Sequence, residues 1–142
     1  MTPVFFASPD SPESRPTPVP LRVLVVDDER DTVLTSMALL RNYGFVVQGA
    51  YDGQSALKQL DEFRPDAVLL DIEMPGMSGF DVAREVRKRP RGRPVLIAIS
   101  GAYVKAPDDV LFRVTGFNHF FRKPYDPQQL VKILSAIVPS PK

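Results

Sequence analysis

Two adjacent aspartates, Asp27 and Asp28, directly follow a short apolar segment near the start of the chain. A third aspartate, Asp71, follows another such segment, within the sequence LLDIEMPG. A serine, Ser100, and a lysine, Lys123, come after two further apolar segments. These carboxylates, the hydroxyl and the ammonium group would form a single polar site if the fold brought the ends of the segments together.

Such a site suits a divalent cation and phosphate chemistry. Two like charges about 4 Å apart repel each other by roughly 4 kcal/mol at an effective dielectric constant near 20, so clustered acids need a cation among them. Oxygen ligands with open coordination positions suit Mg²⁺, which keeps several waters and also binds phosphate oxygens. A single aspartate is more simply explained as a helix cap, and we predict that role for Asp31, which immediately precedes a periodic helix.

The segments between the polar residues show two hydrophobic patterns. Aliphatic runs predict strands at Leu21–Val26, Phe45–Gly49, Ala67–Leu70, Val95–Ile99 and Phe117–Phe121. Apolar residues spaced three and four apart predict helices at Thr32–Arg41, Gln54–Phe63, Ser78–Lys88, Asp108–Thr115 and Gln128–Val138. Several of the strands are nearly continuous aliphatic runs, which is typical of parallel strands buried on both faces.

Strands that alternate with helices in this way predict an α/β fold, in which helices cover both faces of an open parallel sheet. The connections between parallel strands are right-handed in such folds. Ligands bind beyond the carboxyl ends of the strands. The alternation therefore predicts that the polar side chains named above lie together at one edge of the sheet.

The composition narrows the class of protein. The chain has 142 residues, of which 44% are hydrophobic and 25% charged, as in an ordinary soluble domain with its own core. The absence of cysteine excludes disulfides, thiolate metal sites and cysteine catalysis. No apolar run is long enough to span a bilayer, and the N-terminus lacks the pattern of a secretory signal. We expect a cytoplasmic protein without membrane insertion or direct binding to nucleic acid.

Three parts of the chain are distinguished by composition. Residues 1–20 contain six of the 15 prolines and predict a flexible N-terminal tail. Residues 21–138 form the predicted domain, and residues 139–142 form a short C-terminal tail. Within the domain, residues 84–93 carry six basic side chains and one acidic side chain. We favour a solvated helix end and loop for this segment over a contact surface for nucleic acid or an acidic partner.

The chain resembles the receiver domain of bacterial two-component response regulators, of the single-domain type. The resemblance covers residues 21–138. It implies a flavodoxin-like, doubly wound fold with five parallel strands in the order 2-1-3-4-5 and five helices. It is carried by an ordered set of residues: Asp27-Asp28, Asp71 within DIEMPG, Ser100-Gly101 and Lys123-Pro124.

The resemblance implies a role for each residue of the acidic cluster. Asp71 takes a phosphoryl group from a sensor histidine kinase or a phosphotransfer protein and forms an acyl phosphate. Asp28 and Asp71 bind Mg²⁺ or Mn²⁺ through carboxylate oxygens, and Asp27 assists through water. Glu73 supplies a backbone carbonyl to the metal. Because a carboxylate is normally ionised at neutral pH, Asp71 needs no general base. His119, expected in a loop or at a strand edge, is therefore not required for this step.

The resemblance also implies a switch. Lys123 pairs with the phosphoryl oxygens and is joined to Pro124 by a cis peptide bond. Ser100 moves to hydrogen-bond the phosphoryl group, and Phe120 turns inward, which alters the helix 4/strand 5/helix 5 surface offered to a downstream protein. Tyrosine is the commoner family residue at Phe120, and phenylalanine packs inward without needing a hydrogen-bond partner. Phe112 in helix four either packs inside, which we favour, or is exposed as a partner contact.

Other functions fit the residues less well. A degenerate receiver, acting as a phosphorylation-independent binding module, would be marked by loss of the acceptor or of the lysine, and both are present. A flavodoxin-type flavin carrier needs a phosphate loop where Asp27-Asp28-Glu29 would repel phosphate. A small aspartyl phosphatase would use Asp27 with Glu29, which matches the sequence less well.

We expect the chain to be a monomer or weak dimer. We also expect it to promote its own phosphorylation and dephosphorylation without being a turnover enzyme.

The end of the chain leaves two possibilities for output. Only residues 139–142 follow the last predicted helix, so no output domain fits there. If the chain is complete, we expect it to act by binding other proteins. If it is part of a longer protein, its output lies outside this sequence.

Overall fold

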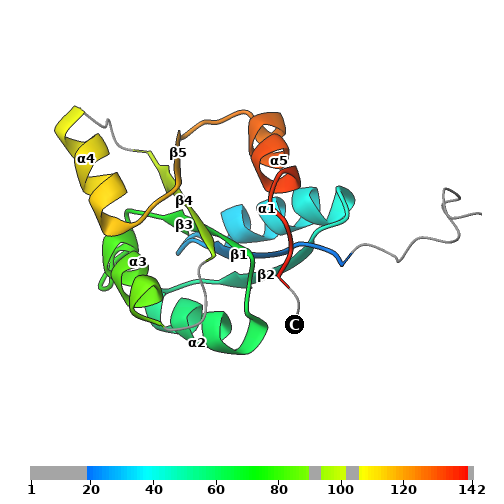
Figure 1. The fold of residues 1–142 in the computed structure, drawn as a ribbon, viewed down its shortest axis with the longest axis horizontal. Coiled ribbons are helices and arrows are strands. Elements are labelled where there is room, and N and C mark those ends of the chain that lie inside the picture. The colour runs from blue at the N-terminus through cyan, green and yellow to red at the C-terminus, as the bar shows by residue number, and fades with distance from the viewer. Residues whose placement is uncertain (1–18, 90–93, 102–105, 141–142) are drawn as a thin grey trace, which may run out of the picture.

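The computed structural model describes residues 19–89, 94–101 and 106–140. Most of the predicted N-terminal tail and part of the basic segment lie outside these ranges. Strands and helices alternate along the described chain (Figure 1). The strands are β1 Arg22–Val26, β2 Val46–Ala50, β3 Ala67–Asp71, β4 Val95–Ser100 and β5 His119–Arg122. The helices are α1 Arg30–Asn42, α2 Gly53–Phe63, α3 Gly79–Lys88, α4 Ala106–Thr115 and α5 Pro127–Ser135.

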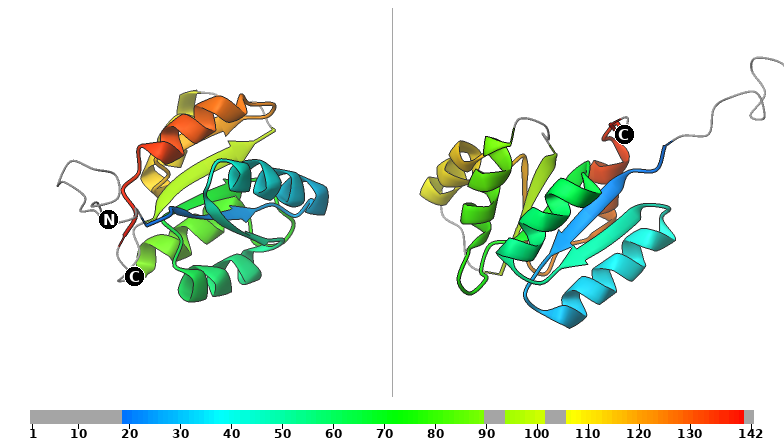
Figure 2. Two further views of the ribbon diagram at one scale, coloured as in Figure 1. Left: turned by 90° about the vertical axis from the view of Figure 1, so that its right-hand side faces the viewer. Right: turned by 90° about the horizontal axis from the view of Figure 1, so that it is seen from below.

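The strands form one parallel sheet in the order β2-β1-β3-β4-β5, which confirms the predicted flavodoxin-like fold class. Helices α1 and α5 cover one face of the sheet, and α2, α3 and α4 cover the other (Figures 1 and 2). Within the described ranges, no helix is long and apolar enough to cross a membrane.

Alternating residues of the strands build a separate core on each face of the sheet. Val23 and Val25 of β1 join a cluster with Val33 of α1 and Leu130 of α5. Leu24, the residue between them, joins the opposite cluster under α2, α3 and α4. This division follows from the two-residue period of a strand, which points neighbouring side chains to opposite faces. Because both faces are covered, β1 is apolar almost throughout.

An aromatic cluster anchors α4 to the sheet. Phe112 of α4 is only 5% exposed, and its ring centroid lies 5.0 Å from that of Phe80, 5.6 Å from that of Phe117 and 4.8 Å from that of Phe120. The preferred interpretation, that Phe112 packs inside, is confirmed, and its exposure as a partner contact is excluded. Val114, two residues later on the same helix, is 78% exposed.

The start of α1 differs from the prediction. The backbone N–H of Val33 donates to the carbonyl oxygen of Glu29 at 3.2 Å, so Glu29 is the N-cap residue and the helix begins at Arg30. The prediction that Asp31 caps this helix is therefore wrong. Asp31 lies in the first turn instead, where its negative charge is near the positive end of the helix dipole.

Asn118 sets the start of β5. Its backbone N–H donates to the carbonyl oxygen of Leu96 at 2.8 Å, and its side-chain oxygen accepts from the N–H of Leu96 at 2.8 Å. Phe117 was expected to open the strand, but its backbone N–H bonds the carbonyl oxygen of Phe112 in the turn that ends α4. The strand therefore begins at His119, which is exposed on an edge strand as predicted.

The end of α5 also differs from the prediction. The helix was expected to continue to Val138 but ends at Ser135. The N–H groups of Ala136 and Ile137 donate to carbonyls three residues back, which tightens the last turn. The apolar spacing continues past the helix because Ile137 still packs against the core.

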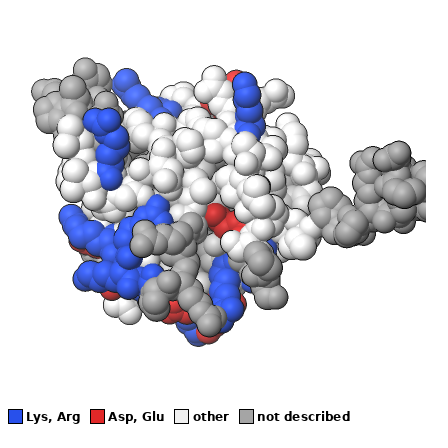
Figure 3. All heavy atoms as spheres, in the orientation of Figure 1, with Lys and Arg blue, Asp and Glu red and all other residues white. Residues whose placement is uncertain are grey.

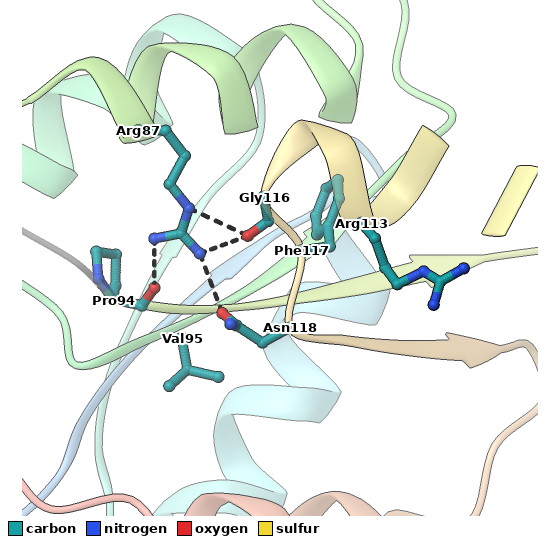
Figure 4. Close-up of a pocket in the computed structure, with 7 residues that line it drawn as sticks. All are labelled: Arg87, Pro94, Val95, Arg113, Gly116, Phe117 and Asn118. Atoms are coloured by element: carbon teal, nitrogen blue, oxygen red, sulfur yellow. Dashed lines mark hydrogen bonds between the residues drawn. The ribbon is translucent and has the colours of Figure 1, made fainter. Parts of the chain in front are cut away.

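Arg87 of α3 holds the turn between α4 and β5 in place. Its guanidinium group donates to the carbonyl oxygens of Gly116 and Pro94, at 3.1 Å and 3.0 Å, and to the side chain of Asn118 at 3.0 Å (Figure 4). Gly116 has a φ of +109°, and a Cβ added there would lie 2.7 Å from Nε of Arg87. The close approach and the positive φ together require glycine at this position.

The three other basic side chains in the described part of the basic segment are all paired. Lys and Arg side chains gather over the α3 region, with acidic side chains beside them (Figure 3). The ion pairs are Arg84–Asp81 at 2.8 Å, Lys88–Glu85 at 3.1 Å and Arg89–Asp61 at 2.9 Å. These contacts support the interpretation of residues 84–89 as a solvated helix end rather than a surface for nucleic acid.

The buried ring of Phe112 gives a prediction about stability. Phe112→Ala should lower the free energy of unfolding by about 3–5 kcal/mol, because it removes a ring that contacts three others and leaves a cavity. Val114→Ala on the same helix is the matched control and should change it by less than about 0.5 kcal/mol. Urea denaturation measures both values. Equal effects of the two substitutions would contradict the packing of α4 described above.

Candidate functional site

The register of the sheet brings the acidic residues together. Val26 of β1 pairs with Leu70 of β3, so Asp27 and Asp71, which follow them, leave neighbouring strands at the same level. Both aspartates are buried, whereas Asp28 is exposed. Carboxylate oxygens of these three aspartates all lie within 4.8 Å of one another. The predicted cluster at the carboxyl edge of the sheet is therefore present.

Backbone hydrogen bonds fix the two buried carboxylates. Oδ1 of Asp27 accepts from the backbone N–H of Glu29 at 3.0 Å, and Oδ1 of Asp71 accepts from the N–H of Glu73 at 3.3 Å. The backbone N–H of Asp27 donates to the carbonyl oxygen of Ala50 on β2 at 3.2 Å. The positions of both acids are thus set by the loops that leave β1 and β3.

Lys123 brings a positive charge to the same site. Its Nζ lies 3.2 Å from Oδ2 of Asp27 and 3.7 Å from Oδ1 of Asp71. Its backbone N–H donates to the carbonyl oxygen of Ser100 at 2.8 Å, and the peptide bond to Pro124 is cis, the form that the resemblance implies. Burial alone would lower the pKa of Lys123, but Asp71 and Asp27 outweigh it, so the pKa is raised and the ammonium form is retained.

The electrostatics of Asp71 differ from the expectation of a fully ionised carboxylate at neutral pH. Burial, followed by the negative charge of Asp27, raises the pKa of Asp71 to about 7, and the opposing attraction of Lys123 is not large enough to restore the usual value. Asp71 is therefore partly protonated near neutral pH unless a further cation is present. The expectation overlooked desolvation and the neighbouring acid, both of which disfavour the charged form.

The residues of the cluster fit a hard divalent cation. Asp27, Asp28 and Asp71 offer only carboxylate oxygens, the ligand type that Mg²⁺ prefers. The pKa of Asp71 is raised first by burial and then by the negative charge of Asp27, and Lys123 offsets only part of this effect. A cation among these acids would lower that pKa and leave Asp71 ionised.

Glu73 makes contacts that the sequence did not indicate. Its carboxylate accepts from the hydroxyl of Ser100, and its Oε1 accepts from the backbone N–H of Gly101 at 3.0 Å. The predicted role of Glu73, a backbone carbonyl for the metal, did not involve this side chain. Because Glu73 lies two residues after Asp71, the sequence indicates added negative charge near the site. Only the fold shows that the Glu73 side chain reaches the end of β4.

The predicted switch residues lie on one face of the sheet. Ser100 is buried at the end of β4 and pairs with Arg122, while Phe120 pairs with Ala98. Because residues two apart on a strand share a face, Ser100 and Phe120 both point toward the side covered by α3 and α4. Phe120 is half-buried against Phe112.

Comparisons with known proteins agree with this geometry. Residues 23–135 match the family model described as the response regulator receiver domain. The transcriptional regulatory protein TrcR of Mycobacterium tuberculosis is 36% identical over 124 residues, which cover 84% of this chain and 46% of that protein. The DNA-binding response regulator MtrA of the same organism is 38% identical over 110 residues, which cover 78% of this chain and 47% of that protein. The chain thus spans about half the length of these curated relatives.

Solved structures share the same fold. The chemotaxis protein CheY4 of Vibrio cholerae superposes with a TM-score of 0.78 and 25% sequence identity. The match covers 84% of this chain and 100% of that one.

The raised pKa of Asp71 predicts how metal binding depends on pH. Below about pH 7 a proton on Asp71 competes with the cation, so the apparent affinity for Mg²⁺ should fall between about pH 8 and pH 6. The fall should approach about tenfold per pH unit once Asp71 is mostly protonated. Calorimetric titration with MgCl₂ at several pH values measures this dependence.

Asp71→Asn is the matched control for this titration. It should bind Mg²⁺ more weakly at pH 8 and with little change in affinity down to about pH 6, since the proton-binding group has been removed. An affinity of the wild-type chain that is constant over this range would show that Asp71 does not titrate there or does not bind the cation.

Proposed function

This chain belongs to the response regulator receiver domain family, and on that basis we propose that Asp71 is a phosphoacceptor. A sensor histidine kinase or a phosphotransfer protein supplies the phosphoryl group. Asp28 and Asp71 would hold Mg²⁺, or Mn²⁺ in its place, with Asp27 assisting through water, and the backbone carbonyl of Glu73 would be a further ligand. The observation that carries the proposal is the meeting of Asp71 with Asp27 and Lys123, from three strand ends, within a few ångströms.

The chemical step is a transfer between two nucleophiles. A carboxylate oxygen of Asp71 attacks the phosphorus atom of a phosphohistidine, a P–O bond forms, and the P–N bond breaks. The histidine nitrogen keeps the electron pair and takes up a proton, and Asp71 becomes an acyl phosphate. Such a transfer requires mainly positioning and compensation of charge on the phosphoryl oxygens.

Each neighbouring side chain has a place in this step. Lys123, which already lies close to Asp71, pairs with a phosphoryl oxygen. The hydroxyl of Ser100 donates to another oxygen. A bound Mg²⁺ supplies positive charge to the transferring group and keeps Asp71 in its ionised, nucleophilic form. Because Asp71 attacks as a carboxylate, no side chain has to remove a proton from it.

Phosphorylation of Asp71 changes the surface formed by α4, β5 and α5. An acyl phosphate carries close to two negative charges, about one more than the carboxylate that it replaces, and places three acceptor oxygens beside Ser100. Movement of Ser100 toward these oxygens frees space on the same face of the sheet, into which Phe120 turns further. The α4–β5–α5 surface thus adopts two conformations, and phosphorylation increases the population of one of them. Phe112 and Phe120, whose ring centroids lie 4.8 Å apart, couple this change to α4.

The partners follow from the same proposal. A phosphodonor protein acts at the acidic site, and a downstream protein binds the α4–β5–α5 surface. TrcR and MtrA are named as transcriptional and DNA-binding regulators, but this chain spans only about half of either. For the domain itself we propose action through protein partners in the cytoplasm, as a monomer or weak dimer without direct binding to nucleic acid. The domain acts on its own phosphorylation state and not as a turnover enzyme.

Removal of the acceptor tests the proposal. After incubation with phosphoramidate and Mg²⁺, intact-mass spectrometry should find one phosphoryl adduct on the wild-type chain and none on Asp71→Ala. Chelation of Mg²⁺ should also prevent the adduct. An adduct of equal yield on Asp71→Ala would contradict the assignment. A wild-type chain that binds Mg²⁺ but takes no phosphoryl group from small donors or from a kinase would favour the phosphorylation-independent binding module.

Removal of the lysine tests charge compensation. Lys123→Ala should slow phosphorylation of the chain by roughly 100-fold, the typical effect of losing one group that stabilises transition-state charge. Lys132→Ala, which removes an exposed lysine from α5, is the matched control and should leave the rate unchanged. The time course of the phosphoryl adduct measures both rates. A rate for Lys123→Ala equal to that of the control would contradict the role of Lys123.

A further inference from the structure

Glu73 bridges the end of β3 to the end of β4. Its backbone N–H bonds Asp71, and its carboxylate accepts from both the Ser100 hydroxyl and the Gly101 backbone N–H. A Cβ added to Gly101 would lie 3.9 Å from Oε1 of Glu73 and 3.9 Å from Cδ of Lys123. The Glu73 carboxylate thus lies at the mouth of the acidic site, and it contributes to raising the pKa of Lys123.

We propose that the Glu73 carboxylate is an internal competitor of the phosphoryl group. This inference rests on the proposed function, in which the phosphoryl group on Asp71 takes a hydrogen bond from Ser100. In the structure that hydroxyl is bonded to Glu73, together with the adjacent N–H of Gly101. Both the carboxylate and the phosphoryl group offer negatively charged oxygens to the same donors, so they cannot occupy those donors at once.

The direction of the effect of Glu73 on phosphorylation follows from hydrogen bonding and charge. Hydrogen bonds from a hydroxyl and an N–H to a carboxylate are charge-assisted, and they are stronger than bonds between neutral groups. A phosphoryl group on Asp71 places close to two negative charges beside Glu73, about one more than the Asp71 carboxylate that it replaces, and these repel the Glu73 carboxylate. Phosphorylation must therefore displace Glu73 from Ser100. Glu73 consequently opposes the phosphorylated arrangement and holds Ser100 until the phosphoryl group is present.

Two effects of Glu73 have to be separated: its negative charge and its hydrogen bonds. Glu29 provides the comparison, because it follows Asp27-Asp28 directly and is exposed. Its side chain accepts from Thr32 on α1, and its contacts do not include Ser100 or Gly101. Glu29→Gln thus removes a charge beside the acidic cluster but leaves the hydrogen bonds at the end of β4 unchanged.

The test measures binding of beryllofluoride, a non-covalent mimic of the aspartyl phosphate, in the presence of Mg²⁺. The ¹⁵N-labelled wild-type chain is compared with Glu73→Ala, with the isosteric Glu73→Gln and with the control Glu29→Gln. The amide resonance of Gly101 reports on both events. It should shift in both Glu73 variants before any ligand is added, because its acceptor has been removed or neutralised, and it reports the Kd during the titration.

Glu73→Ala should bind beryllofluoride about tenfold more tightly than the wild type, because one charge-assisted interaction no longer has to be broken. Glu73→Gln should gain less, and Glu29→Gln should stay within about twofold. In a Ser100→Ala background most of the gain from Glu73→Ala should disappear, since the competition acts through that hydroxyl. A purely structural role of Glu73 would not produce this dependence on Ser100.

The contrary outcomes are distinct. Equal affinities of wild type, Glu73→Ala and Glu29→Gln, or weaker binding by Glu73→Ala, would overturn the inference and leave the proposed function standing. An equal gain from Glu29→Gln and Glu73→Gln would overturn it as well, because charge alone would then explain the effect. Failure of every folded variant to bind beryllofluoride with Mg²⁺ would overturn the proposed function, and the inference would fall with it.

Discussion

Repulsion among three carboxylates at one edge of the sheet is the constraint from which the rest of the site follows. Asp27 and Asp71 are buried side by side, and Asp28 lies next to them but is exposed to solvent. Burial, and after it the negative charge of Asp27, raises the pKa of Asp71. Lys123 offsets part of the charge, and the remainder supports the proposal that a cation binds among the three carboxylates. In the proposed function, a bound cation offsets the repulsion that disfavours three adjacent carboxylates.

The fold makes this arrangement possible because packing elsewhere holds it in place. Asp27 and Lys123 are 96 positions apart in the chain, yet a hydrogen bond joins them. Parallel pairing of β1 with β3 and of β4 with β5 brings the strand ends to a common level. Two cores, one on each face, stabilise these strands. The stability of the hydrophobic layers therefore offsets the electrostatic cost of the acidic edge.

Much of this could be predicted from the sequence because it depends on patterns with a fixed period. The aliphatic runs locate the strands to within a residue or two, and the polar residues that follow them define the site. The protonation of Asp71 could not be predicted, because it depends on burial and on the distance to Asp27. Nor could the contacts of Glu73, because its neighbour in sequence is Asp71 and its neighbours in space come from β4. The cap of α1 could not be predicted because Glu29 and Asp31 both lie within a few residues of Val33, the first apolar residue of the helix, and only the backbone hydrogen bond to Glu29 distinguishes them.

The central claim is that Asp71 itself carries the phosphoryl group. Reduction of the phosphorylated chain with borohydride converts an acyl phosphate of aspartate to homoserine, and tandem mass spectrometry of the peptides then locates it. The account predicts homoserine at position 71 alone, and only when Mg²⁺ was present during phosphorylation. Homoserine at Asp27 or Asp28, or a stable phosphate on Ser100 or His119 with position 71 unmodified, would contradict it.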